Sequence, residues 1–290
     1  MPPFRPANFL PSVMTDKPIV PAPIANLPAP LPPEAEVLVE AQRRSRRAFI
    51  GLGLAGLAGI GGWRWLLSEP DDSGIPHPLR RVLDANSRLT SAYYKETRLA
   101  PEFARRRART PRENGKVGLA AALDPATWRL RVQGYGATTI QEFTLADIRA
   151  LPKIAMTTEL KCIEGWSTVV HWGGARLADF LARYPLATRS GRPADPFNPS
   201  ADLAPYVGML TPDGAYYVGL DMASALHPQT LLCYEMNGQP LTPEHGAPLR
   251  LVTPLKYGVK HIKRIGTIAF TDARPADYWA KLGYDWSGGH

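Results

Sequence analysis

The feature that most limits what this chain can fold into is a long uncharged run near its N-terminus. Residues 48–63 carry no charge, Arg64 interrupts the run, and three apolar residues continue it to Leu67. The whole span has about the length that a helix needs to cross a bilayer. Arginines cluster before the span and acidic residues follow it. This asymmetry predicts a membrane helix with its N-terminus in the cytoplasm and the rest of the chain outside.

The start of this run also carries an export motif. The sequence SRRAFIG, Ser45–Gly51, resembles a twin-arginine signal, which implies export of a folded and often cofactor-loaded protein. No clear A-x-A cleavage motif follows, so we expect an uncleaved anchor in the inner membrane and a catalytic domain in the periplasm. The alternative interpretation is a buried glycine-rich helix of a soluble protein.

The composition on either side of this run sets the expected domain boundaries. Residues 1–33 are so rich in proline that they have few backbone donors and little to bury, which predicts a disordered, partly polyproline tail. The predicted division is a disordered tail at 1–42, a signal or membrane anchor at 43–67, a linker at 68–78 and a globular domain at 79–290.

Charge and cysteine usage exclude several classes of protein. The net charge of +8 permits an acidic partner or an anionic membrane surface. A nucleic-acid role is not expected, because the export segment accounts for part of the arginine content and no nucleic-acid motif is present. The two cysteines, Cys162 and Cys233, are too few for a disulfide scaffold and form no two-cysteine metal motif.

The sequence pattern of the globular part predicts an α+β fold. Alternating or apolar segments bounded by turn residues predict strands, as in WRLRVQGYG and in the two runs that flank Pro212–Gly214. A helix is expected after the cap residue Thr144, and another is expected to end before Pro185. Because strands and helices do not alternate regularly, we predict a mixed or antiparallel sheet.

One cysteine stands in an unusual setting. The stretch TELKCIEGWSTVVHWGG places Cys162 close to Glu164, Trp166 and His171. A lone cysteine is most often an inert packed residue. A thiolate can also attack a substrate or hold a redox metal, and a Cys162–His171 nucleophilic pair would make the protein a hydrolase. The residues alone leave these alternatives open.

Two blocks of the globular part carry a resemblance to a known family. KCIEGWSTVVHWGGARLADFL and LLCYEMNGQPLTPEHGAPLRLVTPLKYGVKHIKRIGTI are similar, in order and spacing, to the sulfite oxidase superfamily of molybdopterin enzymes. The chain most resembles the exported bacterial branch, which includes the periplasmic methionine sulfoxide reductase catalytic subunit. The resemblance implies the sulfite oxidase molybdopterin-binding fold and a Mo-molybdopterin cofactor.

The resemblance also implies roles for individual residues. In this family the metal is held by one pterin dithiolene and one cysteine thiolate, which makes Cys162 the metal ligand and a catalytic residue. An active-site tyrosine falls near Tyr216 and Tyr217, although both could equally be strand core. The implied cofactor-binding residues are Asn86, Cys162, Thr211, His245, Arg250, Lys260, His261, Ile262 and Lys263. Cys233 is expected to be a packed core residue.

The resemblance also limits the set of reactions that we expect. Sulfite oxidases carry an arginine five residues after the metal cysteine, where this chain has Ser167. A pocket with fewer cations favours a neutral substrate, so we expect reduction of an S-oxide or N-oxide, such as a methionine-sulfoxide-type substrate. The alternatives are a sulfite-oxidising enzyme of the same fold and a membrane-tethered, non-catalytic binding module.

Two further expectations concern partners. No haem domain is visible, so we expect electrons from a separate membrane haem protein. No second domain of the kind found in dimeric sulfite oxidases follows residue 275, so we expect a monomer whose aromatic C-terminal segment, DYWAKLGYDWSGGH, packs back on the domain.

Overall fold

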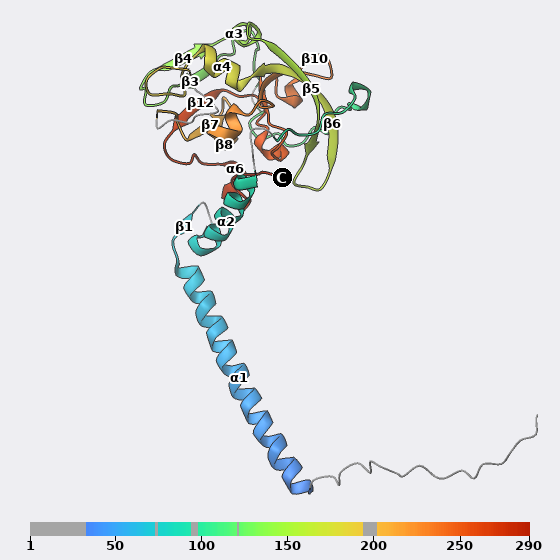
Figure 1. Cartoon of the computed structure of the whole chain (residues 1–290), viewed down its shortest axis with the longest axis vertical. Coiled ribbons are helices and arrows are strands. Elements are labelled where there is room, and N and C mark those ends of the chain that lie inside the picture. Colours follow the sequence, from blue (N-terminus) through green and yellow to red (C-terminus); the bar gives the residue numbers. More distant parts are fainter. Residues whose placement is uncertain (1–32, 73–74, 94–97, 121, 194–201) are drawn as a thin grey trace, which may run out of the picture. The chain divides into compact units, whose positions relative to one another are not determined.

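The computed structural model describes residues 33–72, 75–93, 98–120, 122–193 and 202–290 (Figure 1). The chain divides into two compact units, Met1–Gly62 and Trp63–His290.

Helix α1, Glu34–Ser68, begins directly after Pro33. Its first turn contains Glu34 and Glu36, which favour the positive end of the helix dipole. The expected disordered tail at 1–42 is therefore wrong from residue 34 onward, because the sequence EAEVLVEAQ consists largely of good helix formers. The part of that tail at 1–32 lies outside the described residues.

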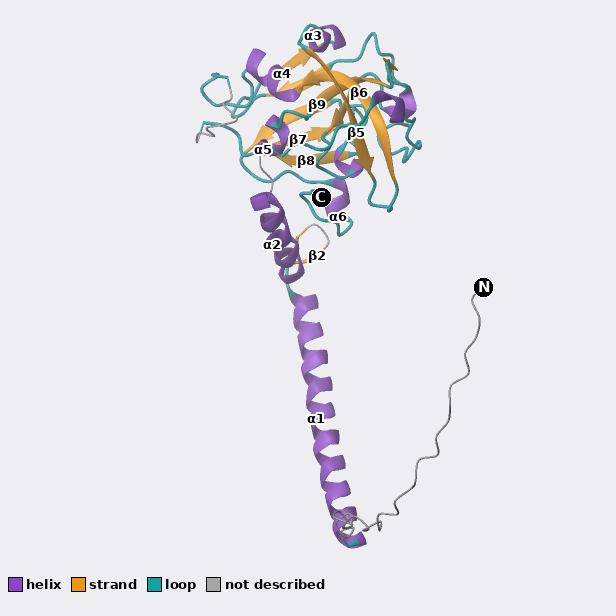
Figure 2. Cartoon of the chain, turned by 45° about the vertical axis from the view of Figure 1, so that its right-hand side comes forward, coloured by secondary structure: helices purple, strands orange, loops and turns teal. Residues whose placement is uncertain are grey.

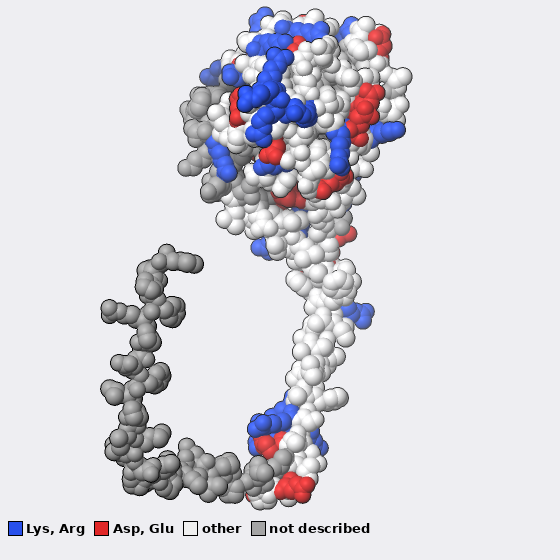
Figure 3. Space-filling view, turned by 90° about the vertical axis from the view of Figure 1, so that its right-hand side faces the viewer, with Lys and Arg blue, Asp and Glu red and all other residues white. Residues whose placement is uncertain are grey.

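The apolar part of α1 is long and apolar enough to cross a membrane, judged by length and composition. A signal sequence or a buried helix of a soluble protein can satisfy the same criterion, but no residue of this apolar window is buried in the structure. Figure 3 shows the stretch as a nearly uncharged surface beyond the charged groups near the start of the helix.

One five-stranded sheet of the globular unit contains His171, Cys233 and Arg250, and Cys162 directly follows one of its strands. Its strand order is β10-β9-β6-β5, and β11 pairs with β9; all pairings are antiparallel. The bounds are β5 Lys153–Lys161, β6 Ser167–Arg176, β9 Leu231–Met236, β10 Gln239–Pro240 and β11 Arg250–Val252. Strand β5 pairs with β6 along its whole length, so the short turn between them is held at both ends.

The second five-stranded sheet has the order β4-β3-β12-β7-β8. Strand β12 runs parallel to β3, and the other pairs are antiparallel, which confirms the expected α+β class with a mixed sheet. The bounds are β3 Leu130–Gln133, β4 Ile140–Phe143, β7 Tyr206–Leu210, β8 Tyr217–Asp221 and β12 Thr267–Thr271. The two sheets share a core in which Leu130 and Val207 of this sheet cluster with Leu232 of the other.

Short helices lie beside the strands (Figure 2). The prediction of a helix after Thr144 is confirmed: Thr144 accepts from the Asp147 amide, and Asp147 in turn accepts from the Thr144 amide. The helix that was expected to end before Pro185 is α4. The helices are α2 His77–Tyr93, α3 Leu145–Arg149, α4 Leu177–Arg183, α5 Met222–Leu226 and α6 Tyr278–Lys281, and the 3-10 turns are η1 Arg105–Arg107, η2 Pro243–His245 and η3 Gly258–Lys260.

Two parts of the fold differ from the sequence-based expectation. Strand β6 was not predicted, because its polar and glycine residues break the alternation that marks a strand. Gly174 is required there by close packing: a Cβ atom at this position would lie 2.4 Å from the Leu232 carbonyl oxygen. The expected linker at 68–78 contains a two-stranded hairpin, β1 Asp71–Asp72 with β2 Ile75–Pro76, and the first residues of α2.

Candidate functional site

Cys162 lies directly after β5, in the turn that leads to β6. Its amide donates to the Trp166 carbonyl at 2.9 Å, and the Gly165 amide donates back to the Cys162 carbonyl at 3.2 Å. Gly165 has φ +84°, a conformation that glycine adopts without strain. The turn thus fixes the backbone of Cys162 and leaves its half-buried thiol at the wall of a cavity.

The cavity has a volume of about 380 Å³ and brings together residues from distant parts of the chain. Its lining can be divided into a group of basic side chains, a group of aromatic rings and the segment around Asn114. Six of the sequence-predicted site residues line it: Cys162, Tyr216, His245, Arg250, His261 and Lys263.

Arg250 is the most deeply buried cation of the cavity, with 3% of its surface exposed. It lies on β11, stacks over the Trp172 ring at 4.9 Å, and donates to the carbonyl oxygens of His245 at 3.1 Å and His261 at 3.3 Å. Its Nε has no hydrogen-bond partner among the described residues. Burial lowers the pKa of this guanidinium to about 10, which still leaves it charged at neutral pH.

The two histidines beside Arg250 are buried and neutral at physiological pH. Burial, followed by the nearby Arg250 charge, lowers the pKa of His261 to about 3, and the same two causes lower the pKa of His245. His261 Nε2 lies 2.9 Å from the Thr253 carbonyl oxygen and 3.4 Å from the Thr253 amide nitrogen. The Nδ1 atoms of both rings are buried without a partner among the described residues.

Lys263 and Asn114 link the basic group to Cys162. Lys263 Nζ donates to the Asn114 carbonyl at 2.7 Å, and the Asn114 side-chain amide lies 3.6 Å from the Cys162 sulfur. Burial and the Arg250 charge lower the pKa of Lys263 to about 8. Asn114 was not predicted from the sequence, because it lies in a basic, loop-like segment with no periodicity to place it.

The structure separates the two candidate tyrosines. Tyr216 lines the cavity, and its hydroxyl donates to the Val259 carbonyl at 2.5 Å. Burial raises the pKa of Tyr216 well above its usual value, so it remains protonated. Tyr217 does not line the cavity; its ring contacts Tyr278 and lies under the Lys281 ammonium group at 5.2 Å.

Four other predicted cofactor residues are not part of the cavity lining. Asn86 is exposed on α2. Thr211 is buried, accepts from the Tyr216 amide at 3.1 Å and packs against Gly118. Ile262 belongs to the core, and the Lys260 ammonium group pairs with Asp277 at 2.6 Å. Thr211, Lys260 and Ile262 lie close in sequence to residues that line the cavity, and Asn86 lies on a helix. The sequence did not show which way these four side chains point.

His171 does not support the alternative of a Cys–His nucleophilic pair. It lies on β6, its Nδ1 is 2.8 Å from the Thr157 hydroxyl, and it lines a separate hollow with Arg105 and Asn237. It is therefore not part of the cavity that Cys162 lines.

The aromatic group of the cavity comes partly from the C-terminal segment, which packs back on the domain as expected. Tyr278 and Trp279 of α6 line the cavity together with Tyr216 and Trp166. Trp286 is buried further along the segment and donates to the Pro275 carbonyl at 2.9 Å. The sequence indicated the packing of this segment but not its contribution to the cavity.

A family comparison matches the part of the chain that builds this cavity. Residues 117–279 match the family described as "Oxidoreductase molybdopterin binding domain". The chain belongs to this molybdopterin-binding oxidoreductase family.

Individual relatives agree with that membership. The oxidoreductase is 32% identical over 251 residues to the "Putative protein-methionine-sulfoxide reductase subunit YedZ1" of Azospira oryzae, covering 84% of this chain and 88% of that protein. It is 36% identical to the "Protein-methionine-sulfoxide reductase catalytic subunit MsrP" of Burkholderia mallei, over 55% of this chain and 48% of that protein. The chain thus spans about half the length of this MsrP relative.

A solved structure shows a weaker likeness. The sulfane dehydrogenase SoxCD of Paracoccus pantotrophus matches with a TM-score of 0.43 and 18% identity, over 53% of this chain and 41% of that chain. The family match and the sequence relatives together confirm the resemblance seen in the two sequence blocks.

The cavity of this oxidoreductase fits a molybdopterin cofactor. Buried nitrogens of His245, Arg250 and His261 have no partner among the described residues, which is the state expected of groups that await a ligand. Arg250 and Lys263 supply cations for a phosphate, and Cys162 supplies a thiol for a soft metal. His245, Arg250, His261 and Lys263 would hold the pterin, and Cys162 would hold the metal.

The buried His261 predicts loss of stability in acid. Its pKa is about 3 in the folded protein and near 6.5 when unfolded, so between these values the unfolded state binds the extra proton. We expect this residue to lower the unfolding free energy of the cofactor-free oxidoreductase by up to about 1.4 kcal/mol per pH unit as the pH falls from 6.5. Urea unfolding of the full chain in detergent at pH 7, 6 and 5 measures this slope.

His261→Gln should show a shallower slope than the wild-type protein over the same range. His77→Gln is the matched control, because His77 is exposed at the start of α2. Equal slopes in wild type and His261→Gln would contradict the prediction.

Proposed function

We propose that this chain is a membrane-anchored molybdopterin oxidoreductase that reduces an S-oxide, such as the sulfoxide of a methionine side chain, or an N-oxide. The observation that carries the proposal is one cavity lined by Cys162, by the buried Arg250 and by four aromatic rings. The relatives named as methionine sulfoxide reductase subunits support the same substrate class.

The residues of the cavity would have different roles in such a reaction. When bound, the cofactor supplies two-electron oxygen-atom transfer. Cys162 would hold the metal, and Arg250 and Lys263 would hold the pterin phosphate. The aromatic rings would orient the apolar groups of the substrate and exclude water. A sulfoxide takes up two electrons and two protons, its S–O bond breaks, and a thioether and water are released.

Sulfite oxidation is the second candidate. Ser167 replaces the arginine of sulfite oxidases, and its hydroxyl donates to Glu159 at 2.5 Å rather than lining the cavity. One observation nevertheless favours an anionic substrate: Arg112 lines the cavity and lies 5.8 Å above the Trp166 ring. A direct assay must therefore compare both substrates.

The assay uses full-length, molybdenum-loaded protein. We expect oxidation of a reduced viologen dye to depend on added methionine sulfoxide, and we expect sulfite to reduce an electron acceptor at less than about one hundredth of that rate, a difference of roughly 3 kcal/mol in transition-state stabilisation. Sulfite turnover without sulfoxide turnover would refute the proposal and establish the second candidate. A molybdenum-free protein from a cofactor-competent host would favour the binding module.

We further propose that α1 anchors the enzyme in the inner membrane, with the globular unit in the periplasm after twin-arginine export. The apolar helix and the arginines at its start support this location. Release of the protein from membranes by alkaline carbonate would contradict the anchor.

Electrons would come from a separate membrane haem protein. Sulfoxide-dependent oxidation of reduced haem should occur in native membranes and be absent when this chain is deleted. Equal haem oxidation with and without the chain would contradict this part of the proposal. For the oligomeric state, we propose a monomer, which light scattering in detergent tests.

A further inference from the structure

The C-terminal segment supplies one side of the cavity. Tyr278 and Trp279, both half-buried, line it together with Tyr216. The Tyr278 ring lies 5.1 Å from the Tyr216 ring, and the Trp279 ring lies 5.7 Å from the Tyr278 ring. We call this surface, made by Tyr278 and Trp279, the aromatic wall.

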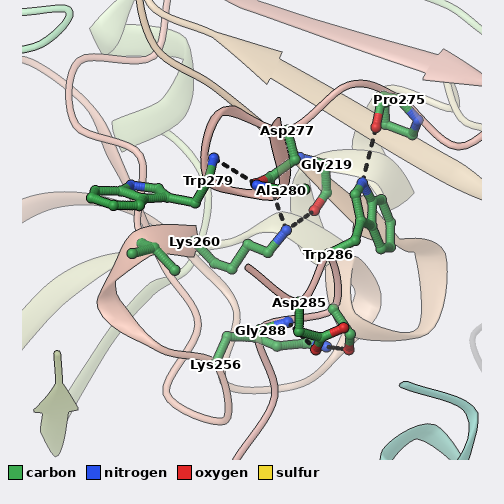
Figure 4. Close-up of polar contacts among 12 residues, drawn as sticks. Gly219, Lys256, Lys260, Pro275, Asp277, Trp279, Ala280, Asp285, Trp286 and Gly288 are labelled. Atoms are coloured by element: carbon green, nitrogen blue, oxygen red, sulfur yellow. Dashed lines mark hydrogen bonds and ion pairs between the residues drawn. The ribbon is translucent and has the colours of Figure 1, made fainter. Parts of the chain in front are cut away.

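A buried ion pair fixes the segment that carries the aromatic wall. Lys260 is 1% exposed and Asp277 is 4% exposed. Lys260 Nζ donates to the Asp277 carboxylate at 2.6 Å and to the Gly219 carbonyl at 3.0 Å (Figure 4). The Lys260 ammonium group is thus already paired, and its partner Asp277 belongs to the segment that carries the aromatic wall.

Asp277 also contacts the backbone of the aromatic wall directly. Its second carboxylate oxygen accepts from the amides of Trp279 at 3.2 Å and Ala280 at 3.1 Å, which fixes the first turn of α6. Its other oxygen also accepts from the Gly219 amide at 3.2 Å. One carboxylate therefore joins Lys260, strand β8 and the backbone of Trp279.

Lys260 is also next in sequence to residues that line the cavity. It is the last residue of η3, and its neighbours Val259 and His261 both line the cavity. The Val259 carbonyl accepts from the Tyr216 hydroxyl. The ammonium group also lies 4.8 Å from the Trp286 ring, so a second part of the C-terminal segment packs on it. The ion pair thus ties the aromatic wall to the residues that flank His261.

We propose that Lys260 and Asp277 are positioning residues that hold the aromatic wall in the cavity, and that Trp279 and Tyr278 select sulfoxides with large apolar or aromatic substituents over small ones. This inference rests on the proposed function. The physical reason is that a large apolar or aromatic substituent can make ring contacts and bury apolar surface against these rings, which the methyl groups of a small sulfoxide cannot do to the same extent.

The test compares two neutral substrates in molybdenum-loaded, full-length protein: methyl p-tolyl sulfoxide, which is large, and dimethyl sulfoxide, which is small. Selectivity is the ratio of their kcat/KM values. Trp279→Ala should lower this ratio about tenfold, through KM for the large substrate, because an aromatic contact is lost. Leu282→Ala, an exposed change in the same segment, is the matched control and should leave the ratio unchanged.

The positioning role is tested with Lys260→Met/Asp277→Asn. This pair removes both charges together, so no uncompensated buried charge remains, and asparagine keeps an oxygen that can cap α6. We expect a loss of selectivity in the same direction as in Trp279→Ala, an unchanged molybdenum content, and faster amide hydrogen exchange in residues 278–284. An unchanged ratio in Trp279→Ala overturns the selective role of the aromatic wall, and unchanged hydrogen exchange in the double variant overturns the anchoring role.

Failure of the proposed function gives a different result. A wild-type protein that reduces neither sulfoxide refutes the proposed function, and the hydrogen-exchange measurement then still decides whether Lys260 and Asp277 hold the segment.

Discussion

Cys162→Ser is expected to abolish both molybdenum retention and sulfoxide reduction. The sequence resemblance implies that a cysteine thiolate holds the metal, and Cys162 is the cysteine that lines the cavity. A serine hydroxyl stays protonated near neutral pH and is a poor ligand for a soft redox metal. Elemental analysis after gel filtration should find about one molybdenum per wild-type chain and almost none in the variant, with activity reduced to that of cofactor-free protein.

Cys233→Ala provides the matched control for this prediction. Cys233 is fully buried in β9, its thiol donates to the Glu235 carbonyl at 3.2 Å, and burial raises its pKa to about 11. It belongs to a small core cluster with Val170 and Trp172. We expect Cys233→Ala to keep its molybdenum at a modest cost in stability. Full molybdenum content together with wild-type activity in Cys162→Ser would exclude the thiolate as the ligand.

Arg250→Met is expected to weaken cofactor retention by at least about 30-fold, because a buried cation that faces an anion contributes several kcal/mol to its binding. The same change should alter the unfolding free energy of the cofactor-free protein by no more than about 2 kcal/mol. The reason is that burial of the Arg250 charge costs roughly 3 kcal/mol, which offsets the hydrogen bonds that its guanidinium donates to two backbone carbonyls.

Arg80→Met separates this effect from a general loss of structure. Arg80 is also buried, at 2% exposure, but it donates to the Ala280 carbonyl and does not line the cavity. We expect Arg80→Met to lower stability without a direct effect on cofactor binding. Molybdenum content and urea unfolding, measured on both variants, test the pair of expectations. Wild-type molybdenum content in Arg250→Met would exclude the proposed phosphate contact.

The sequence predicted the fold class and most strands, because turn residues and apolar alternation mark them locally. It missed β6, because the glycines of this strand are required by close packing against β9 and not by a local sequence pattern. It also placed the start of the first helix too late, since the proline-rich composition was extended past Pro33 into a stretch of helix-forming residues.

The candidate site was also predictable only in part. Cys162, His245 and Arg250 lie in blocks whose order and spacing carry the family resemblance. Lys260 was assigned to the cofactor because it stands beside His261, yet its side chain points to Asp277. Asn114 and Trp279 reach the cavity only through tertiary packing, so no local signal placed them there.

The closeness of residues 289 and 290 to the turn that contains Cys162 has a practical consequence for protein engineering. His290 Nδ1 lies 3.3 Å from the ammonium group of Lys161, which directly precedes Cys162, and Gly289 forms a backbone bridge with Lys256. A purification tag joined after His290 would begin close to the turn that contains Cys162. An epitope inserted at an exposed loop such as the one around Gly191 would leave that neighbourhood untouched.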